Sequence, residues 1–254
     1  MGLDQRHRRR RAGHRLLKAQ PPPASVPGVY RDPMLEDRVL FIDGEAIIID
    51  KPAGLAVDRP RDRSPSVEAM LGDLTFGFQR LPQPVHRLDR DTSGCLLLAR
   101  NPKAHKRFQA AFEAGQVTKR YLAVLDGAPD EDAGLIDLAL AKVSSAATGW
   151  RMRGDPRGKP ARTRWRVLER GKGRALVAFY PETGRTHQIR VHAAEGLGIP
   201  IMGDPVYGRA GPHLMLHAAE LNVPRPPKPD VRADAPLPPH FLAMDFARLD
   251  RGDG

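Results

Sequence analysis

The sequence predicts an α+β fold. Segments with strand character and segments with helix character are mixed along the chain without regular alternation, which argues against a doubly wound parallel sheet. The chain has 254 residues, a length that suits one large domain or two small ones. Its only cysteine is Cys95, so no internal disulfide can form, and a reducing compartment fits. We expect Cys95 to be a small buried apolar residue, since three leucines follow it.

Three regions differ in composition. Residues 1–33 contain the basic block RHRRRRAGHR and the proline-rich segment PPPASVPG, so we expect a flexible, extended arm that contacts phosphate groups. Residues 34–249 carry the apolar patterns of a folded domain, and residues 250–254 form a short tail. The sequence therefore predicts one folded domain with a basic extension at its N-terminus.

The first part of the folded domain predicts a hairpin followed by a loop. Residues 38–50, RVLFIDGEAIIID, have apolar runs on either side of an Asp-Gly dipeptide that is typical of hairpin turns. A proline and a glycine then break the pattern, which indicates a loop over residues 51–57. Residues 58–84 are polar and irregular, and a short helix is expected near 64–72.

The clearest helix follows at residues 101–115. Asn101 is a favourable N-cap, and Pro102 suits the first helical position. Phe108 and Phe112 then share one face of the helix, and a glycine can end it.

The second half of the chain predicts more strands than helices. The segments TRWRVLER and RALVAFYP have the alternation and the apolar content of strands. Ile189, Ala193 and Leu197 follow one another at intervals of four, which predicts a helix within residues 182–198 after a short turn. The other segments are a strand at 119–127, a loop-rich excursion at 128–160, a turn at 203–208, a core segment at 213–221 and a proline-rich surface passage at 225–241.

The charge of the chain indicates its class of partner. Lysine and arginine number 41 against 30 aspartate and glutamate, giving a net charge of +11 and a pI of about 10.3. An excess of this size predicts a polyanionic partner, most often nucleic acid. No apolar run approaches the ~20 residues that span a membrane, and the N-terminus lacks the apolar core of a signal peptide, so we expect a cytoplasmic protein.

The segment VHRLDRDTSGCLLLARN, residues 85–101, is the leading candidate for a catalytic loop. Asp89 lies between Arg87 and Arg90, and two guanidinium groups favour the ionised form of a carboxyl group. An ionised carboxylate can act as a nucleophile, although a surface aspartate in a charge cluster has the same local sequence. Asp91 adds the second carboxylate that a glycoside hydrolase requires, but the segment DTSG also favours a turn.

The sequence lacks the common metal and cofactor motifs. His213 and His217 lie four residues apart, but no glutamate follows the first as HExxH requires, and His187 and His192 lie five apart. No GxxxxGK[ST] or GxGxxG loop for phosphate is present. We therefore expect neither a metal nor a cofactor.

Three segments together resemble the signature segments of the RluA-type RNA pseudouridine synthases. They are HRLDRDTSG (86–94), TKRYLAV (118–124) and GRTHQIRVH (184–192), in the order and spacing of that family. The passages DKPAGLAV, GDPVYG, LMLHAAEL and APLPPHF resemble the family as well. The resemblance covers about residues 38–246 and leaves out the arm. The chain resembles the short form of the family, without an N-terminal S4-type RNA-binding domain.

The resemblance implies a fold and a reaction. The fold of that family has a central mixed, mainly antiparallel sheet with flanking helices and loops and an RNA-binding cleft. Its members detach uracil from C1′ of the ribose at N1, turn the base and reattach it through C5, with no cofactor or metal. We therefore expect a monomeric enzyme that acts on structured RNA, either rRNA or tRNA.

The resemblance also implies roles for individual residues. Asp89 matches the catalytic carboxylate, Tyr121 matches the active-site tyrosine that stacks on uracil, and Arg185 matches the arginine that pairs with the aspartate. The residues expected to contact RNA are Arg87, which would fill the space left by the flipped uridine, and His187, Gln188, Arg190 and Leu216, which would line the cleft.

Two other functions are compatible with parts of the sequence. An RNA-binding or RNA-folding factor could use the same fold without chemistry, but the complete set of Asp89, Tyr121 and Arg185 argues against it. A carbohydrate-active hydrolase could use Asp89 and Asp91, but the basic charge and the lack of a separated acid–base pair argue against that.

Overall fold

The computed structural model describes residues 34–145 and 149–246. The arm expected at residues 1–33 and the tail expected at 250–254 lie outside the described residues, as does the C-terminal boundary predicted at residue 249. Among the described residues, no helix is long and apolar enough to cross a membrane.

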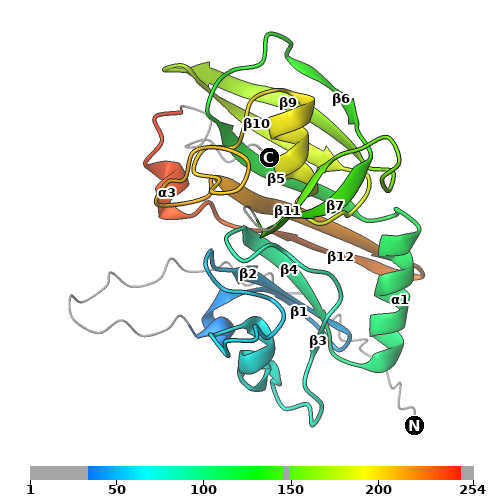
Figure 1. The fold of residues 1–254 in the computed structure, drawn as a ribbon. Helices are drawn as coiled ribbons and strands as arrows, with labels where there is room; N and C mark the ends of the chain where they lie inside the picture. Colours follow the sequence, from blue (N-terminus) through cyan, green and yellow to red (C-terminus); the bar gives the residue numbers. More distant parts are fainter. Residues whose placement is uncertain (1–33, 146–148, 247–254) are drawn as a thin grey trace, which may run out of the picture. The chain divides into compact units, whose positions relative to one another are not determined.

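A ten-stranded sheet forms the centre of the described part of the chain (Figure 1). Its strands are β1 (Val39–Ile42), β2 (Ala46–Lys51), β3 (Gln83–Pro84), β4 (Ser93–Ala99), β5 (Thr118–Leu125), β6 (Ala133–Asp137), β9 (Arg162–Gly171), β10 (Arg174–Pro181), β11 (Leu216–Arg225) and β12 (Lys228–Asp234). The order is β1-β2-β4-β11-β5-β10-β9-β6, with β3 beside β4 and β12 beside β11. Only β4 and β11 pair in parallel, so the sheet is mixed and mainly antiparallel, which confirms the predicted α+β class.

Short helices flank this sheet. They are η1 (Leu35–Arg38), η2 (Val67–Leu74), α1 (Pro102–Glu113), α2 (Gln188–Val191), the π-helical turn η3 (His192–Gly196) and α3 (Pro239–Leu242). The predicted start of α1 is confirmed, because the Asn101 side chain accepts a hydrogen bond from the Ala104 amide at 2.9 Å and Pro102 follows the cap. Phe108 is fully buried between α1 and the sheet.

The hairpin predicted at residues 38–50 is present as β1 and β2. The Asp43 side chain begins the return strand, since its Oδ1 accepts hydrogen bonds from the amides of Glu45 and Ala46 at 2.8 and 2.9 Å. The short helix expected near residues 64–72 is η2, which is capped by Ser66. Local turn and cap chemistry therefore set these boundaries.

Strand β4 is buried on both faces along its whole length. Cys95 and Leu97 pack in a cluster with α1, whereas Leu96 and Leu98 pack on the opposite side against η1 and η2. This explains why the sequence is continuously apolar there instead of alternating. The prediction that Cys95 is a buried apolar residue is confirmed, and burial raises the pKa of its thiol to about 12.

The parallel pair β4–β11 joins the two halves of the sheet through a very close approach. Gly94 lies opposite Ala218 with φ = +105°, and a Cβ atom at Gly94 would lie 2.2 Å from the Ala218 carbonyl oxygen. Only glycine fits this conformation and this spacing. The close approach fixes the start of β4, and the loop that carries Asp89 ends there.

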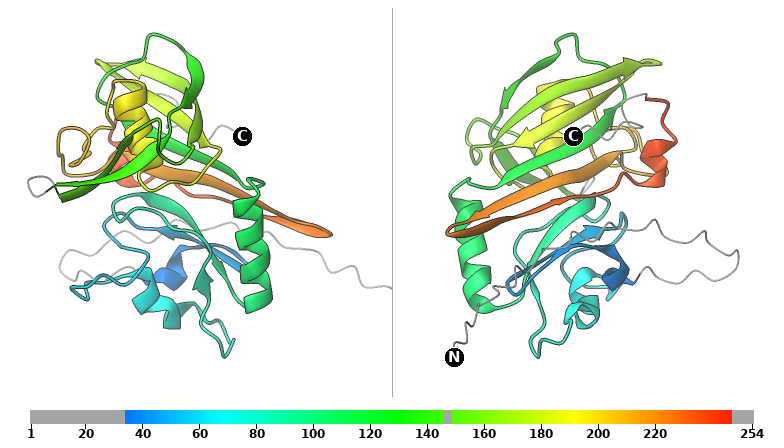
Figure 2. Two further views of the ribbon diagram at one scale, coloured as in Figure 1. Left: turned by 45° about the vertical axis from the view of Figure 1, so that its right-hand side comes forward. Right: turned by 180° about the vertical axis from the view of Figure 1, so that it is seen from behind.

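The prediction of a loop-rich excursion at residues 128–160 was wrong. This region contains β6, an edge strand of the main sheet, and a separate antiparallel hairpin of β7 (Leu140–Ser145) and β8 (Gly149–Gly154). An edge strand and a two-stranded hairpin bury few side chains, so they lack a clear apolar alternation. The hairpin stands out from the sheet beside α2 (Figure 2).

The surface passage predicted at residues 225–241 is largely exposed, but it contains a strand and a short helix that the prediction missed. Strand β12 pairs with β11, and its Val231 and Ala233 side chains are buried. Helix α3 then buries Phe241 completely. The prolines that suggested a loop lie in the turn between the strands and near the ends of elements, where a missing amide hydrogen is tolerated.

Candidate active site

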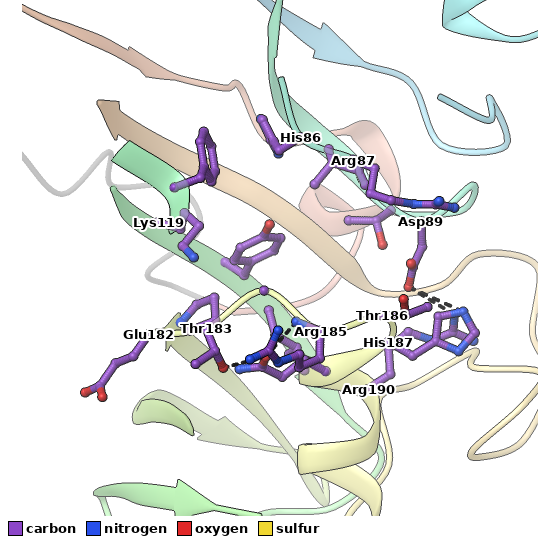
Figure 3. A pocket seen from close by; sticks show the side chains of 18 of the residues that line it. His86, Arg87, Asp89, Lys119, Glu182, Thr183, Arg185, Thr186, His187 and Arg190 are labelled. Atoms are coloured by element: carbon purple, nitrogen blue, oxygen red, sulfur yellow. Dashed lines mark hydrogen bonds and ion pairs between the residues drawn. The ribbon is translucent and has the colours of Figure 1, made fainter. Parts of the chain in front are cut away.

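A cavity of about 430 Å³ lies beside strands β4 and β11, which join the two halves of the sheet. Its walls come from the loop before β4, the C-terminal end of α1, the first half of β5 and residues 181–190, with Leu216 from β11 (Figure 3). This volume is within the range of small-ligand pockets. Asp89, Tyr121 and Arg185, the predicted catalytic residues, all line it.

Asp89 presents its carboxylate at one side of this cavity. Its Oδ2 atom accepts a hydrogen bond from Arg190 Nη1 at 3.2 Å and lies 3.9 Å from His187 Nε2. Its Oδ1 atom receives no hydrogen bond from any described residue. One carboxylate oxygen is therefore fixed by a cation while the other is available to a ligand.

Arg190 is held in place by a second carboxylate behind it. Arg190 Nε and Nη2 donate to the two oxygens of Asp204 at 2.7 and 2.8 Å, and both side chains are buried. Burial lowers the pKa of Arg190, but the combined effect of Asp204 and Asp89 is larger and in the opposite direction. The pKa of Arg190 is therefore raised overall. Arg190 therefore presents a permanent positive charge to Asp89 in a fixed direction.

The predicted pair of Asp89 with Arg185 is not formed. Arg185 is exposed, and its Nε donates to the Pro160 carbonyl oxygen at 3.0 Å. Arg190, five positions further along the same segment, takes the role that the sequence assigned to Arg185. The physical reason is the backbone at His187, where φ is +54° and the chain turns before α2 begins.

His187 lies at the edge of the cavity between Asp89 and two aromatic rings. Its Nδ1 shares a hydrogen bond of 2.8 Å with the Tyr207 hydroxyl. Trp150 from β8 stacks on its ring with centroids 5.3 Å apart. Burial lowers the pKa of His187, and the Asp89 carboxylate opposes this shift. The site thus extends from Asp89 to the β7–β8 hairpin.

Tyr121 lies on β5 and lines the cavity beside Asp89. Burial raises the pKa of its phenol, and the Asp89 charge adds to this shift. The ring is packed against two core clusters, and the phenol stays protonated at neutral pH. Its geometry suits a stacking surface for a planar base.

The predicted RNA contacts have different environments. Arg87 is exposed at the rim and pairs with Asp58 at 2.9 Å, and Leu216 is a buried apolar wall. Gln188 is buried, and its amide bonds to Thr163, Arg162 and Thr183 inside the protein. Gln188 lines the cavity as predicted, and its amide organises the cavity wall, while its contact with RNA stays a prediction.

The loop that carries Asp89 rests on a buried lysine that sequence reasoning missed. Lys51 is fully buried, and its three N–H groups reach the carbonyl oxygens of Pro52, Leu55 and Arg90 at 2.8, 2.8 and 3.0 Å. Burial lowers its pKa to about 7, although the neighbouring aspartates oppose this shift. The signals in the sequence are a lysine at the end of the apolar strand β2 and its place in the family-like passage DKPAGLAV.

Asp204 and Tyr207 were also missed as site residues, because the segment GDPVYG indicates a turn and a family resemblance but no role for a single side chain. It is a turn, with the Asp204 Oδ1 atom accepting from the Val206 and Tyr207 amides. Asp91, by contrast, is exposed and does not line the cavity, which removes the paired-carboxylate hydrolase interpretation. Within residues 34–145 and 149–246, no three histidine, cysteine or acidic side chains gather as a metal site would require.

The family model and the most similar curated proteins all indicate the same family. Residues 45–195 match the family described as RNA pseudouridylate synthase. The chain is 57% identical over 218 residues to an uncharacterized RNA pseudouridine synthase of Zymomonas mobilis, covering 84% of this chain and 100% of that one. It is 38% identical over 192 residues to ribosomal large subunit pseudouridine synthase D of Nitrosomonas europaea, covering 74% of this chain but only 54% of that protein.

The fold agrees with solved structures. The structure of human RNA pseudouridylate synthase domain containing 4 matches with a TM-score of 0.69 and 25% identity, over 82% of this chain and 91% of that one. Human RNA pseudouridylate synthase domain containing 1 matches with a TM-score of 0.66 and 29% identity, over 79% and 83%. The chain therefore belongs to the RNA pseudouridine synthases, the enzymes that isomerise uridine in RNA.

Proposed function

We propose that the cavity beside Asp89 binds one uridine extruded from structured RNA and converts it to pseudouridine. The observation that carries this proposal is the asymmetric carboxylate of Asp89, a residue that lines the cavity: Arg190 fixes Oδ2, whereas Oδ1 accepts no hydrogen bond from any described residue. A carboxylate that is oriented before the substrate arrives can act on the ribose without reorganising. Asp89 is the catalytic residue, and Arg190 replaces Arg185 as its partner.

The chemistry needs no atom from outside the substrate. The C1′–N1 bond breaks with the help of Asp89, the base turns, and a C5–C1′ bond forms. C5 loses its proton and N1 gains one, so the product is an isomer of uridine. Tyr121 stacks on the base and Leu216 forms an apolar wall, which compensates in part for the few kcal/mol of unstacking.

The RNA surface around the cavity combines positive charge with an exposed aromatic ring. Arg87 lies at the rim, where it can contact the strand that loses its uridine. Trp150 is 50% exposed and stacks on His187, and Lys142 lies 5.0 Å from the centre of its ring. Aromatic rings beside lysine are typical of surfaces that stack unpaired bases. The hairpin contains no acidic residue between Leu140 and Gly154.

Large-subunit rRNA is the proposed substrate, with tRNA as the second candidate. Two relatives, from Nitrosomonas europaea and Vibrio cholerae, are named ribosomal large subunit pseudouridine synthases D and C. The net charge of +11 supports a large polyanionic substrate. We propose a monomeric enzyme that acts in the cytoplasm, and the rRNA-modifying names of these relatives support that location.

The test is pseudouridine mapping on total RNA from a strain that lacks the gene, complemented with the wild-type gene or with Asp89→Asn. We expect one or a few sites to lose pseudouridine in the deletion strain and to regain it only with the wild-type gene. Restoration by Asp89→Asn would remove the catalytic role of Asp89. Unchanged pseudouridine at all sites would instead favour an RNA-binding factor without catalysis.

A further inference from the structure

Lys119 lines the same cavity but has no hydrogen-bond or ion-pair partner among the residues that the structure describes. It lies on β5 two residues before Tyr121, so both side chains project from the same face of the strand, about 6–7 Å apart. Figure 3 shows its side chain on the side of the cavity away from Asp89. Across the described part of the chain, no residue forms a hydrogen bond or an ion pair with its ammonium group.

No described carboxylate compensates the charge of Lys119 through an ion pair or a lowered desolvation cost. Burial alone lowers its pKa to about 8, and no neighbouring carboxylate opposes this shift. His86 is kept neutral by burial, which lowers its pKa to about 3. The titratable and charged groups that line the cavity with Lys119 are His86, Arg87 and Asp89 before β4, Glu113 on α1, Tyr121 on β5, and Glu182, Arg185, His187 and Arg190 before and within α2.

A desolvated ammonium group without a partner indicates an anionic ligand group at that point. The reaction produces such a group. When the C1′–N1 bond breaks, its electron pair stays with N1, and the negative charge spreads over O2 and O4 of the detached uracil. The charge is largest after the bond has broken, so a cation placed there stabilises the transition state more than the bound uridine.

We propose that Lys119 stabilises the detached uracil anion by donating a hydrogen bond to the ring carbonyl oxygen farthest from the ribose. This proposal rests on the proposed function, because it requires the ribose to lie at Asp89 and the base to lie on Tyr121. Because Lys119 and Tyr121 are neighbours on one face of β5, the base then extends from Asp89 across the tyrosine toward Lys119.

The geometry of uracil allows one fixed cation to serve both halves of the reaction. C4 is opposite N1 in the ring, and C2 is opposite C5. The remote oxygen is therefore O4 while N1 faces C1′, and O2 once C5 faces C1′. As C5 bonds to C1′ with an electron pair of the anion, C5 releases its proton and N1 takes one up, and the negative charge on the base is lost. Lys119 keeps the same kind of contact throughout and need not move.

The test compares Lys119→Met and Lys119→Arg with Lys103→Met, which removes an exposed lysine of α1 that does not line the cavity. The probe is large-subunit rRNA from the deletion strain, labelled with [5-³H]uridine, and the readout is tritium released from C5 in single-turnover reactions with saturating enzyme. RNA affinity is measured separately by filter binding.

We expect Lys119→Met to lower the saturating rate by about 10²–10³-fold, the usual effect of losing one donor to a developing anion, with RNA affinity little changed. Lys119→Arg should recover part of the rate, and Lys103→Met should match the wild type. At subsaturating enzyme, the wild-type rate should fall as pH rises through about 8, because Lys119 loses its proton there. The rate of Lys119→Met should not show this fall.

Two results would overturn the proposal. A saturating rate unchanged in Lys119→Met excludes a role in the chemistry. A loss of RNA affinity with a smaller salt dependence, and an unchanged saturating rate, assigns Lys119 to a backbone phosphate instead. Failure of the proposed function is distinct from both, because wild-type enzyme and Asp89→Asn would then release equal tritium from the same RNA.

Discussion

Asp204 contacts the guanidinium group of Arg190 at two points, 2.7 and 2.8 Å away, whereas the cavity-facing Asp89 contacts it at one point, 3.2 Å away. Asp204 is fully buried, and Asp89 is partly exposed. The buried carboxylate therefore fixes the arginine, and the arginine fixes the reactive carboxylate. Arg190 is shared between two negative charges, so the second contact orients Asp89 without neutralising it completely.

The first prediction separates the two arginines of the segment GRTHQIRVH. Arg190→Lys should lower the saturating single-turnover rate by about 10²–10³-fold, because a lysine cannot make the two-point contact with Asp204 and still reach Asp89. Arg185→Lys should change that rate by less than about threefold, the effect of a surface substitution. The measurement is tritium release with each variant, and the reverse order of effects would restore Arg185 as the partner of Asp89.

The second prediction concerns Asp204. Asp204→Asn should lower the free energy of unfolding by about 3–5 kcal/mol, since it breaks a buried ion pair while keeping the shape of the side chain. The rate at saturating enzyme should also fall, because Arg190 loses its fixed direction. Urea unfolding gives the stability. Asp155→Asn is the matched control, because Asp155 also accepts a backbone amide in a turn but is much less buried.

An equal loss of stability in both aspartate variants would mean that turn capping, rather than the contact with Arg190, explains the effect of Asp204. A wild-type saturating rate for folded Asp204→Asn would mean that Arg190 orients Asp89 without its contact with Asp204. Either result would contradict the order of contacts from Asp204 through Arg190 to Asp89.

The parts of the fold that the sequence predicts correctly are those with strong local signals. Helix α1 has an Asn-Pro start, and β1 and β2 meet at an Asp-Gly turn whose side chain caps the return strand. The β7–β8 hairpin has neither a turn dipeptide of this kind nor a buried face, and β12 follows consecutive prolines. These strands form because they pair with neighbouring strands, and a local sequence pattern does not predict that pairing.

The site shows the same limit at the level of single residues. The loop of Asp89 is evident from its charges, and Tyr121 from its motif. Which of Arg185 and Arg190 pairs with Asp89 depends on the left-handed backbone conformation of His187. A histidine in the sequence does not predict that conformation. Lys51 is buried and Lys119 is partly buried because elements distant in the chain cover them, so their roles require the tertiary structure.

The third prediction is a pH dependence of stability caused by Lys51. The pKa of Lys51 is lowered from 10.5 to about 7 in the folded protein, so between these values the unfolded chain binds the proton more tightly than the folded protein. The free energy of unfolding therefore gains a contribution that rises with pH, by at most about 1.4 kcal/mol per unit, and that is flat below about pH 7.

Lys51→Met should remove this contribution. The free energy of unfolding of the wild type minus that of the variant should therefore become more positive as pH rises from 7 to 9.5. Urea unfolding of both proteins at several pH values measures it, and other titrating groups cancel in the difference. Lys103→Met serves as the control with an exposed lysine. A difference that stays constant with pH would mean that Lys51 keeps its ordinary pKa through its three carbonyl contacts.

The fourth prediction tests the β7–β8 hairpin as an RNA surface. Trp150→Ala should weaken RNA binding by about 10-fold, within the 1–3 kcal/mol that a stacked base contributes. The salt dependence should not change, because no charge is removed. Lys142→Met should weaken binding and reduce the slope of log affinity against log salt by about 0.7–0.9, the value for one phosphate contact.

Filter binding across a salt series distinguishes these effects, and Trp150→Tyr is the control that keeps an aromatic ring. An affinity unchanged by Trp150→Ala would mean that the ring serves only to pack His187 against the cavity. In that case the saturating rate, rather than the affinity, should fall, because His187 lies 3.9 Å from Asp89 and would lose its support. The pair of measurements thus assigns the exposed tryptophan either to substrate binding or to the geometry of the catalytic carboxylate.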